Sequence, residues 1–169
     1  NTLLLTMNID LDKIIITRVG TSDVEAMVAC RLQYLAELQG ERPASVVKEL
    51  KSELTRYFTS GIQNATVIAL VAIFEEKPVA YGAVVLRSVP GDFNGAAYIE
   101  GDVLNMYTIP EVRRRGISKM ILLGLIDEAQ RQGVSKLALH TTAAGEKLYR
   151  SVGFHNPVYP YLELELGKK

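Results

Sequence analysis

The spacing of apolar residues along the chain predicts one domain built from strands and helices. Runs rich in β-branched and other apolar residues predict strands at residues 14–19, 66–74, 79–86, 97–108, 136–140 and 159–166. Apolar residues spaced three and four apart predict helices at residues 22–39, 45–58, 118–131 and 143–151. No repeat, low-complexity tract or linker interrupts these elements, so we expect residues 1–169 to form a single mixed α/β or α+β sheet domain.

Capping and turn residues set the expected boundaries of these elements. Ser22 and Glu25 have the spacing of a capping box at the start of the first helix. The pair Ser60-Gly61 is expected to end the second helix. The segment 89–95 is rich in Gly, Pro, Asn and Asp, which predicts a loop, and a β-bulge is expected near Gly101 in the long strand that follows.

The composition limits the classes of partner and the compartment. The 19 Lys and Arg residues balance the 19 Asp and Glu residues, so the net charge does not indicate a nucleic-acid partner. Cys30 is the single cysteine and there are two histidines, which excludes an internal disulfide and leaves few ligands for a metal site. We therefore expect no metal and a reducing, cytoplasmic compartment.

The apolar runs are too short to predict a membrane span. The longest, residues 65–74, is about half of the roughly 20 residues that cross a bilayer, so we expect no membrane partner. Residues 1–6 lack the basic start and the cleavage site of a secretory signal. We expect them to be a cloning remnant, a processed end or a disordered lead into a start near Met7.

A basic loop that contains a glycine joins the predicted strand 97–108 to the next helix. Three arginines, at positions 113–115, stand directly before Gly116. The first N–H groups of a helix lack intrahelical partners and carry partial positive charge, and a glycine lets a ligand approach the backbone closely. The loop therefore indicates a phosphate site, with a solvated basic surface as the alternative. The glycine patterns of a P-loop and of a dinucleotide-binding fingerprint are both absent.

The segment from Tyr107 to Ser118 resembles the acyl-CoA signature of the GNAT superfamily of N-acetyltransferases. That signature is Gln or Arg, two further residues, Gly, one further residue, and Gly or Ala. Arg113 and Gly116 fill the first two positions, and Ser118 stands where Gly or Ala is usual. The segment 140–154 resembles a later motif of the family, a helix with Leu-Tyr followed by Gly-Phe. Both motifs occur in order, about 30 residues apart, with a predicted strand between them.

The resemblance implies a mostly antiparallel mixed sheet flanked by helices, and acetyl-CoA as the cosubstrate. In the family, the strand before the basic loop and the next strand splay apart, and the pantetheine arm binds in that gap. The residues so implied in cofactor binding are Met106, Tyr107, Thr108, Arg113, Arg114, Arg115, Gly116, Ile117, Ser118 and His140. A structural hydrogen bond is the alternative role for His140.

The reaction implied by the resemblance is direct attack of a neutral amine on the acetyl thioester. A strand N–H near Met106 or Tyr107 would stabilise the oxyanion. Tyr149 matches the tyrosine that the family often uses as a proton donor, with a packing role as the alternative. Glu100 or Asp102 could accept the amine proton, directly or through water, and both could instead be ordinary surface or bulge carboxylates.

Asn105 is a polar residue beside the expected thioester position, which suggests a role in binding or catalysis, with hydrogen bonding within a bulge as the alternative. The acceptor side would come from the first two helices and the loop 90–95, with Tyr34, Glu37 and Arg42 as candidates. No motif identifies the acceptor amine.

The leading hypothesis is an acetyl-CoA-dependent N-acetyltransferase for a primary amine, on a small molecule more than on a protein. A non-catalytic acyl-CoA-binding regulatory domain of the same fold is the first alternative, and an unrelated nucleotide-phosphate binder is the second. The predicted terminal strand and the hairpin also offer edges through which a homodimer could form.

Overall fold

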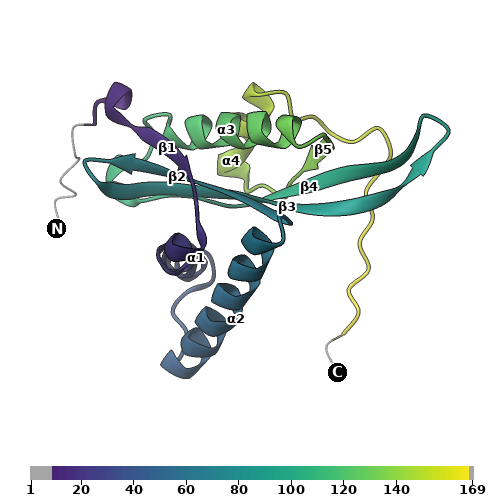
Figure 1. Ribbon diagram of the computed structural model, residues 1–169. Coiled ribbons are helices and arrows are strands. Elements are labelled where there is room, and N and C mark those ends of the chain that lie inside the picture. Colours follow the sequence, from purple (N-terminus) through teal and green to yellow (C-terminus); the bar gives the residue numbers. More distant parts are fainter. Residues whose placement is uncertain (1–8, 168–169) are drawn as a thin grey trace.

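The computed structural model describes residues 9–167, which form one five-stranded sheet in the order β1-β2-β3-β4-β5 (Figure 1). The strands are β1 (Ile15–Arg18), β2 (Val67–Phe74), β3 (Lys77–Asp92), β4 (Gly95–Thr108) and β5 (Val134–Ala138). The first four strands pair antiparallel with their neighbours, and β5 runs parallel to β4. The prediction of a mixed, mostly antiparallel sheet is confirmed.

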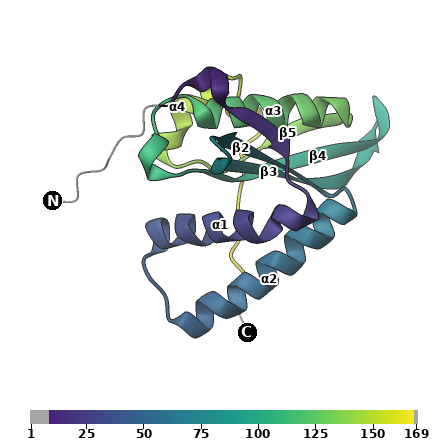
Figure 2. The ribbon, with the colours of Figure 1, turned by 60° about the vertical axis from the view of Figure 1, so that its left-hand side comes forward.

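Helices cover both faces of this sheet (Figures 1 and 2). The helices are α1 (Val24–Gln39) and α2 (Ala44–Gln63) on one face, and α3 (Ile117–Arg131) and α4 (Ala143–Ser151) on the other. Short 3-10 turns occur at Leu11–Lys13, Thr21–Asp23 and Pro110–Val112. None of the helices in residues 9–167 is both long and apolar enough to cross a membrane.

Each face of the sheet has its own hydrophobic core. On one face, α3 buries Ile121, Leu122 and Leu125 completely. On the other face, α1 buries Met27 and Val28 against residues of β2 and β3. Because seven of the eight residues of β2 are buried, this strand reads as a continuous apolar run rather than an alternating one.

Two expected helix boundaries are wrong. At the start of α1, Ser22 is not the cap: Asp23 accepts a hydrogen bond from the N–H of Gly20 at 3.0 Å, within a 3-10 turn. Gly61 does not end α2, which continues to Gln63, and a Cβ at that glycine would collide with Val67. A helical glycine is therefore required for α2 to pack against β2.

The predicted loop at residues 89–95 is also wrong, because β3 and β4 continue through it as a long hairpin. The tip is held by Asp92, whose Oδ1 accepts hydrogen bonds from the N–H of Asn94 at 2.8 Å and from the hydroxyl of Tyr98 at 2.7 Å. This side chain closes the turn in the way that a backbone acceptor would.

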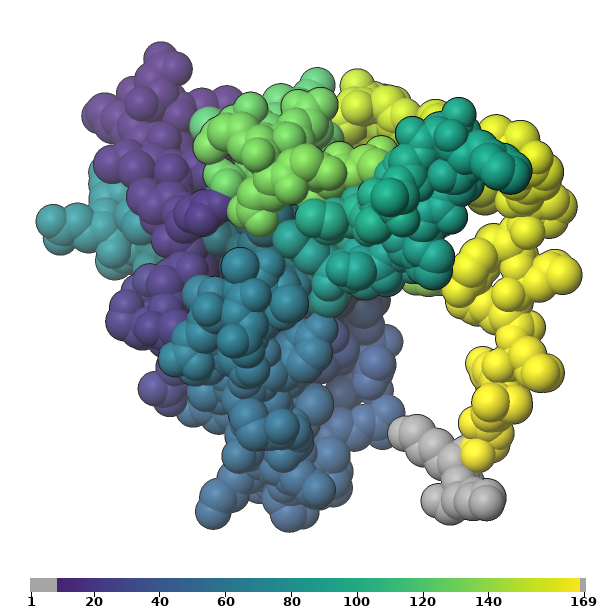
Figure 3. Space-filling model, turned by 45° about the vertical axis from the view of Figure 1, so that its right-hand side comes forward, coloured from purple at the N-terminus to yellow at the C-terminus, as the bar shows by residue number. Residues whose placement is uncertain are grey.

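The predicted terminal strand at residues 159–166 does not form. The segment is extended, but no described residue pairs with it in the sheet, and it stands away from α2 in the space-filling view (Figure 3). Its leucines are strongly exposed, at 88% for Leu162 and 83% for both Leu164 and Leu166. The alternating pattern is present, but the described part of the chain supplies no strand to pair with it.

Candidate functional site: a bulged strand beside a helix start

The site begins at a bulge in β4. The pairing of β3 with β4 shifts between Tyr81, opposite Tyr107, and Ala83, opposite Leu104, so β4 contains one extra residue. The extra residue is accommodated at Asn105, which adopts a left-handed φ of 59° that asparagine tolerates better than most residues. The bulge was expected near Gly101, four residues too early.

The bulge changes which side chains face α1. Leu104 belongs to the core on the α1 face, and Asn105 also faces α1, where its Oδ1 lies 3.5 Å from Nη1 of Arg31. Met106 then packs on the α3 side, and a Cβ on Gly82 would lie only 2.6 Å from its sulfur. Glycine at position 82 therefore makes room for the bulge.

A gap between β4 and β5 opens immediately before the bulge. The two strands pair only from Ile99 to Asp102 on β4, which leaves residues 103–108 without a described partner on the β5 side. Their backbone groups on that edge are open to an extended ligand, in the way that a sheet edge accepts an added strand.

The N-terminus of α3 lies directly after the open part of β4. Arg114 and Gly116 both have positive φ, 65° and 87°, and a Cβ on Gly116 would have nothing within 4 Å. No described residue accepts a hydrogen bond from the backbone N–H groups of residues 114–119. These free donors and the helix dipole favour an anion at this position.

The structure holds Arg113 against the protein. Its Nη2 lies 2.9 and 2.8 Å from the two carboxylate oxygens of Glu37, its Nε donates to the carbonyl of Thr108 at 2.8 Å, and its guanidinium lies 5.3 Å from the ring centre of Tyr107. Glu37 also accepts a hydrogen bond from the hydroxyl of Tyr107 at 2.8 Å. Burial, followed by this hydrogen bond, raises the pKa of Tyr107 to about 12. Arg113 thus joins the loop to β4 and α1, while Arg114 and Arg115 make no described ion pair.

Ser118, the residue that departs from the family signature, also has a partner. Its hydroxyl lies 2.8 Å from the hydroxyl of Thr108, which is buried at the end of β4. The pair joins the first turn of α3 to the open strand. A residue larger than serine would occupy the space between these two elements.

Tyr149 of α4 is half-buried, and its ring lies 5.8 Å from that of Phe154 at an angle of 77°. Burial raises the pKa of Tyr149, and the phenol of Tyr34 raises it further. Tyr34 belongs to α1 and Tyr149 to α4, on opposite faces of the sheet. The ring centre of Tyr34 lies 6.2 Å from that of Tyr107, so Tyr34 contacts the open part of β4 from the α1 side.

The structure does not bring Glu100 to this place. Its side chain is 14% exposed and lies 2.6 Å from Arg87 and 2.7 Å from Lys136, so both carboxylate oxygens are occupied. Five strand residues, about 17 Å, separate it from Asn105. Asp102 is half-exposed and lies 3.5 Å from Arg87.

His140 has its described contacts with the C-terminal segment. Its side chain is strongly exposed after the end of β5, where Nε2 lies 4.0 Å from Glu163 and the ring faces Tyr161. Arg42, in the link between α1 and α2, is exposed and makes no described ion pair. These two residues stay predictions.

One residue of the site was missed from the sequence. Arg31 follows Met27 by four residues and Val28 by three, so it continues the buried face of α1 toward Asn105. This spacing could have identified Arg31 from the sequence. A charged side chain in the buried stripe of an amphipathic helix is unusual unless it has a partner.

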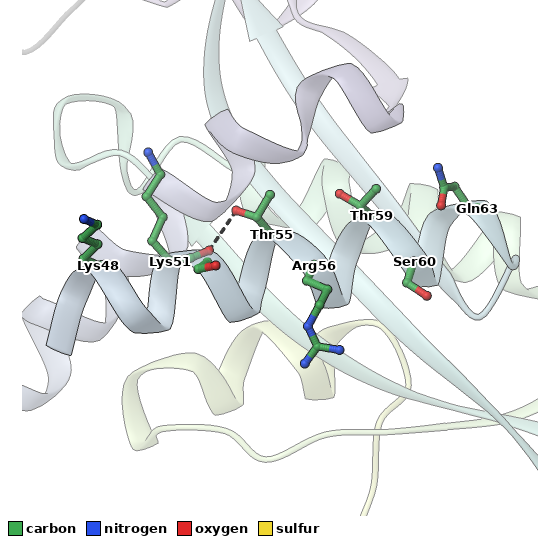
Figure 4. Close-up of a pocket in the computed structure, with 8 residues that line it drawn as sticks. Lys48, Lys51, Thr55, Arg56, Thr59, Ser60 and Gln63 are labelled. Carbon is green, nitrogen blue, oxygen red and sulfur yellow. Dashed lines mark hydrogen bonds between the residues drawn. The ribbon is translucent and has the colours of Figure 1, made fainter. Parts of the chain in front are cut away.

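A hollow lies elsewhere, on the polar side of α2 (Figure 4). It measures about 730 Å³ and is lined by residues of that one helix, including Lys48, Lys51 and Arg56. It contains none of the candidate site residues and is a helix surface rather than an enclosed cavity. In the described part of the chain, no group of three or more His, Cys, Asp or Glu residues could hold a metal ion.

Comparison with known proteins gives a consistent result. The family model for the acetyltransferase (GNAT) family matches residues 32–154. A predicted acetyltransferase with acetyl-CoA from Clostridium acetobutylicum is 26% identical, with a TM-score of 0.78 over 90% of this chain and 96% of that chain. No curated protein sequence matches the chain.

Two further solved structures share the fold. A ribosomal-protein-alanine N-acetyltransferase from Brucella melitensis is 22% identical, with a TM-score of 0.65 over 91% of this chain and 99% of that chain. A glucosamine-6-phosphate N-acetyltransferase from Arabidopsis thaliana is 18% identical, with a TM-score of 0.65 over 89% and 97%.

The matched residues include the β4 bulge, the gap, the basic loop and Tyr149. This family supports acyltransferase activity, and the relative with acetyl-CoA supports acetyl-CoA as the cosubstrate. The chain belongs to the acetyltransferase (GNAT) family.

Proposed function

We propose that this protein is an N-acetyltransferase that transfers the acetyl group of acetyl-CoA to a primary amine of a small molecule. The observation that carries the proposal is the open edge of β4 at residues 103–108, which leads directly to the free N–H groups at the start of α3. Acetyl-CoA needs an anion site for its pyrophosphate at one end and a proton donor near its thioester at the other end.

Acetyl-CoA would bind along this edge. The backbone N–H groups of residues 114–118 would hold the pyrophosphate, with Arg114 and Arg115 supplying mobile positive charge. The pantetheine arm would bond to the open backbone at Met106 and Thr108. Arg113 and Ser118 would keep the loop and the helix start in place through their contacts with Glu37 and Thr108.

The chemistry would then be a direct displacement. The neutral amine attacks the thioester carbonyl carbon, and the resulting oxyanion is stabilised by a strand N–H near Met106 or Tyr107. As the C–S bond breaks, Tyr149 donates its hydroxyl proton to the departing thiolate. The amine loses a proton to water, because the predicted base Glu100 is held in two ion pairs away from the bulge.

The test is a screen of amines with detection of free CoA, run on the wild type and on Tyr149→Phe. Acetylation of an amine that is strongly reduced in Tyr149→Phe supports the proposal. CoA binding by calorimetry without thiol release from any amine would favour the non-catalytic regulatory domain. ATP binding without CoA binding would favour the nucleotide-phosphate binder.

We also propose that the protein is a cytoplasmic homodimer. The single Cys30 is suited to a reducing compartment, and the exposed leucines of residues 159–166 need a cover that the described chain does not supply. Light scattering on the full chain and on a chain ending at Pro157 tests the dimer. A monomer at all concentrations of the full chain would contradict it.

A further inference from the structure

Arg31 lies on the buried face of α1. The preceding residues of that face, Val24, Met27 and Val28, have exposed fractions of 1%, 0% and 0%. At the next position on the face the chain has Arg31, which reaches β4 beside Asn105. An apolar residue at this position would have continued the packing of the face, so packing does not account for an arginine there.

Neither Arg31 nor Asn105 has its hydrogen-bonding groups satisfied within residues 9–167. The Nε of Arg31 and the Nδ2 of Asn105 are both buried without a partner. The single contact between them, Nη1 to Oδ1 at 3.5 Å, is at the outer limit of a hydrogen bond. Asn105 itself is only 4% exposed. Buried polar groups without partners are rare in folded proteins and indicate a ligand or a water at that place.

Other arginines that join separate elements of the fold differ from Arg31, because each has a carboxylate partner. Arg18 pairs with the buried carboxylate of Glu128, Arg113 pairs with Glu37, and Arg87 pairs with Glu100. No described carboxylate lies within ion-pair distance of Arg31. Burial lowers the pKa of Arg31, and the phenols of Tyr34 and Tyr57 only partly oppose that effect.

The position of Arg31 relates it to the reaction. Asn105 is the bulge residue in the open part of β4, and Tyr34, one turn along α1 from Arg31, has its ring centre 6.2 Å from that of Tyr107 in the same part of the strand. The unpaired guanidinium therefore lies on the α1 side of the open part of β4, where we propose that acetyl-CoA binds. A ligand group bound there would lie on the α1 side of the thioester position, where the acceptor enters.

We propose that Arg31 binds a carboxylate of the acceptor, so that the substrate is a small amine that also carries a carboxylate, such as an amino acid. The planar fork of a guanidinium matches a carboxylate with two parallel N–H donors. The free Nδ2 of Asn105 supplies a further donor to the same group. This inference rests on the proposed acetyl transfer and specifies its substrate class.

The experiment compares matched amines by the release of free CoA. Each amino acid is paired with the amine that lacks its carboxylate, for example leucine with isopentylamine and phenylalanine with phenethylamine, and with the corresponding aminophosphonate. We expect the wild type to prefer the amino acids. In Arg31→Met, kcat/KM for the amino acids should fall at least about 30-fold, to the level of the neutral amines. The KM for acetyl-CoA should be unchanged.

Two further variants separate binding from folding. Arg56→Met removes an exposed arginine of α2 that pairs with Glu53, and it should leave the preference intact. Arg31→Lys keeps the charge without the planar fork and should recover part of the preference. Because Arg31 has no ion-pair partner in the described chain and only a 3.5 Å contact with Asn105, Arg31→Met should melt at the same temperature as the wild type or higher, whereas a structural role would lower the melting temperature.

Each remaining outcome decides the question. Equal turnover of neutral amines and amino acids, or an unchanged preference in Arg31→Met, would overturn the inference and leave acetyl transfer standing. A preference for aminophosphonates would replace the carboxylate with a phosphate group. If no amine is acetylated, the proposed function fails, and calorimetric titration of leucine and phenylalanine into the CoA-bound wild type and Arg31→Met tests the carboxylate site by itself. Equal heats in both proteins would then overturn it.

Discussion

The two halves of β4 differ in whether their buried polar side chains have partners. In the first half, residues 95–102, the strand pairs with β3 along its length and with β5 at residues 99–102, and the carboxylate of Glu100 is held between Arg87 and Lys136. In the second half, residues 103–108, one edge is open, and Asn105 and its neighbour Arg31 have buried groups without partners. The polar side chain of the first half has its partners within the fold, whereas the second half has buried polar groups without partners.

This difference is a better guide to function than burial or charge alone. Glu100 and Asn105 are both polar residues of β4 and both are largely buried. Neither residue type nor burial therefore tells which of them has a catalytic role. The hydrogen-bond and ion-pair partners of the two residues distinguish them. A buried polar group that is already paired within the fold is less available to a ligand than one without a partner. The predictions below test this distinction, from the largest expected effect to the smallest.

Tyr149→Phe tests the chemistry at the open half. We expect kcat to fall by about 100-fold, because the departing thiolate loses its proton donor, while acetyl-CoA affinity stays the same. Burial raises the pKa of Tyr149, so the wild-type phenol should stay protonated and active beyond the ordinary phenol pKa of about 10. Steady-state kinetics from pH 7 to about 10.5 measures both effects.

The control for this variant is Tyr159→Phe, which changes a strongly exposed tyrosine in the C-terminal segment. It should leave kcat as it is. An unchanged kcat in Tyr149→Phe would remove that residue from the mechanism and leave it a packing role beside Phe154.

Gly82→Ala tests the support of the bulge. The added Cβ would lie 2.6 Å from both the sulfur of Met106 and a methyl group of Ile121, inside a packed core. We expect the free energy of unfolding to fall by about 1–3 kcal/mol, as for other overpacked sites. Urea denaturation measures the change.

Gly20→Ala is the matched control, since the nearest atom to its Cβ would lie 3.4 Å away and its φ is ordinary. It should change stability by less than about 0.5 kcal/mol. If both variants are equally stable, the bulge does not depend on glycine at position 82.

Ser118→Ala tests the join between the open strand and α3. Loss of the hydrogen bond with Thr108 should lower the free energy of unfolding by about 1 kcal/mol. CoA affinity, measured by calorimetry, should change only a few-fold, because the backbone N–H groups that we propose as the phosphate site remain. Together with Thr108→Val, a double-mutant cycle should show non-additive changes, and full additivity would mean that the two hydroxyl groups do not interact.

Much of the fold could be predicted from the sequence alone, because the apolar residues of most segments are spaced as in a helix or a strand. The four helices and five strands lie close to their predicted positions, and the helix from Ala143 to Ser151 is capped by Thr142, which accepts a hydrogen bond from the N–H of Gly145 at 3.3 Å. The misplaced boundaries have tertiary causes. Gly61 stays helical because of Val67, and the hairpin beyond residue 89 is stabilised by pairing across strands that local composition does not encode.

The candidate site was less predictable than the fold. The basic loop could be found from Arg113 and Gly116, but the ion pair of Arg113 with Glu37 joins residues 76 positions apart and has no local signal. The position of the bulge depends on pairing with β3 in the same way. Arg31 could have been found, since it interrupts a buried stripe, but its missing partner is visible only when the neighbouring strand is in place.

Glu100→Gln is the counterpart in the completed half of β4, and it should have the smallest effect. The variant keeps the shape of the side chain and its hydrogen-bonding oxygen while it removes the charge. Arg87 and Lys136 are more than half exposed, so solvent screens both ion pairs and stability should change by no more than about 1 kcal/mol. The pH–rate profile should match that of the wild type, because the carboxylate is held by Arg87 and Lys136 away from the bulge. Loss of turnover with a shifted acidic limb, absent from the matched Asp102→Asn variant, would instead make Glu100 the general base and would show that paired polar groups on this strand still take part in catalysis.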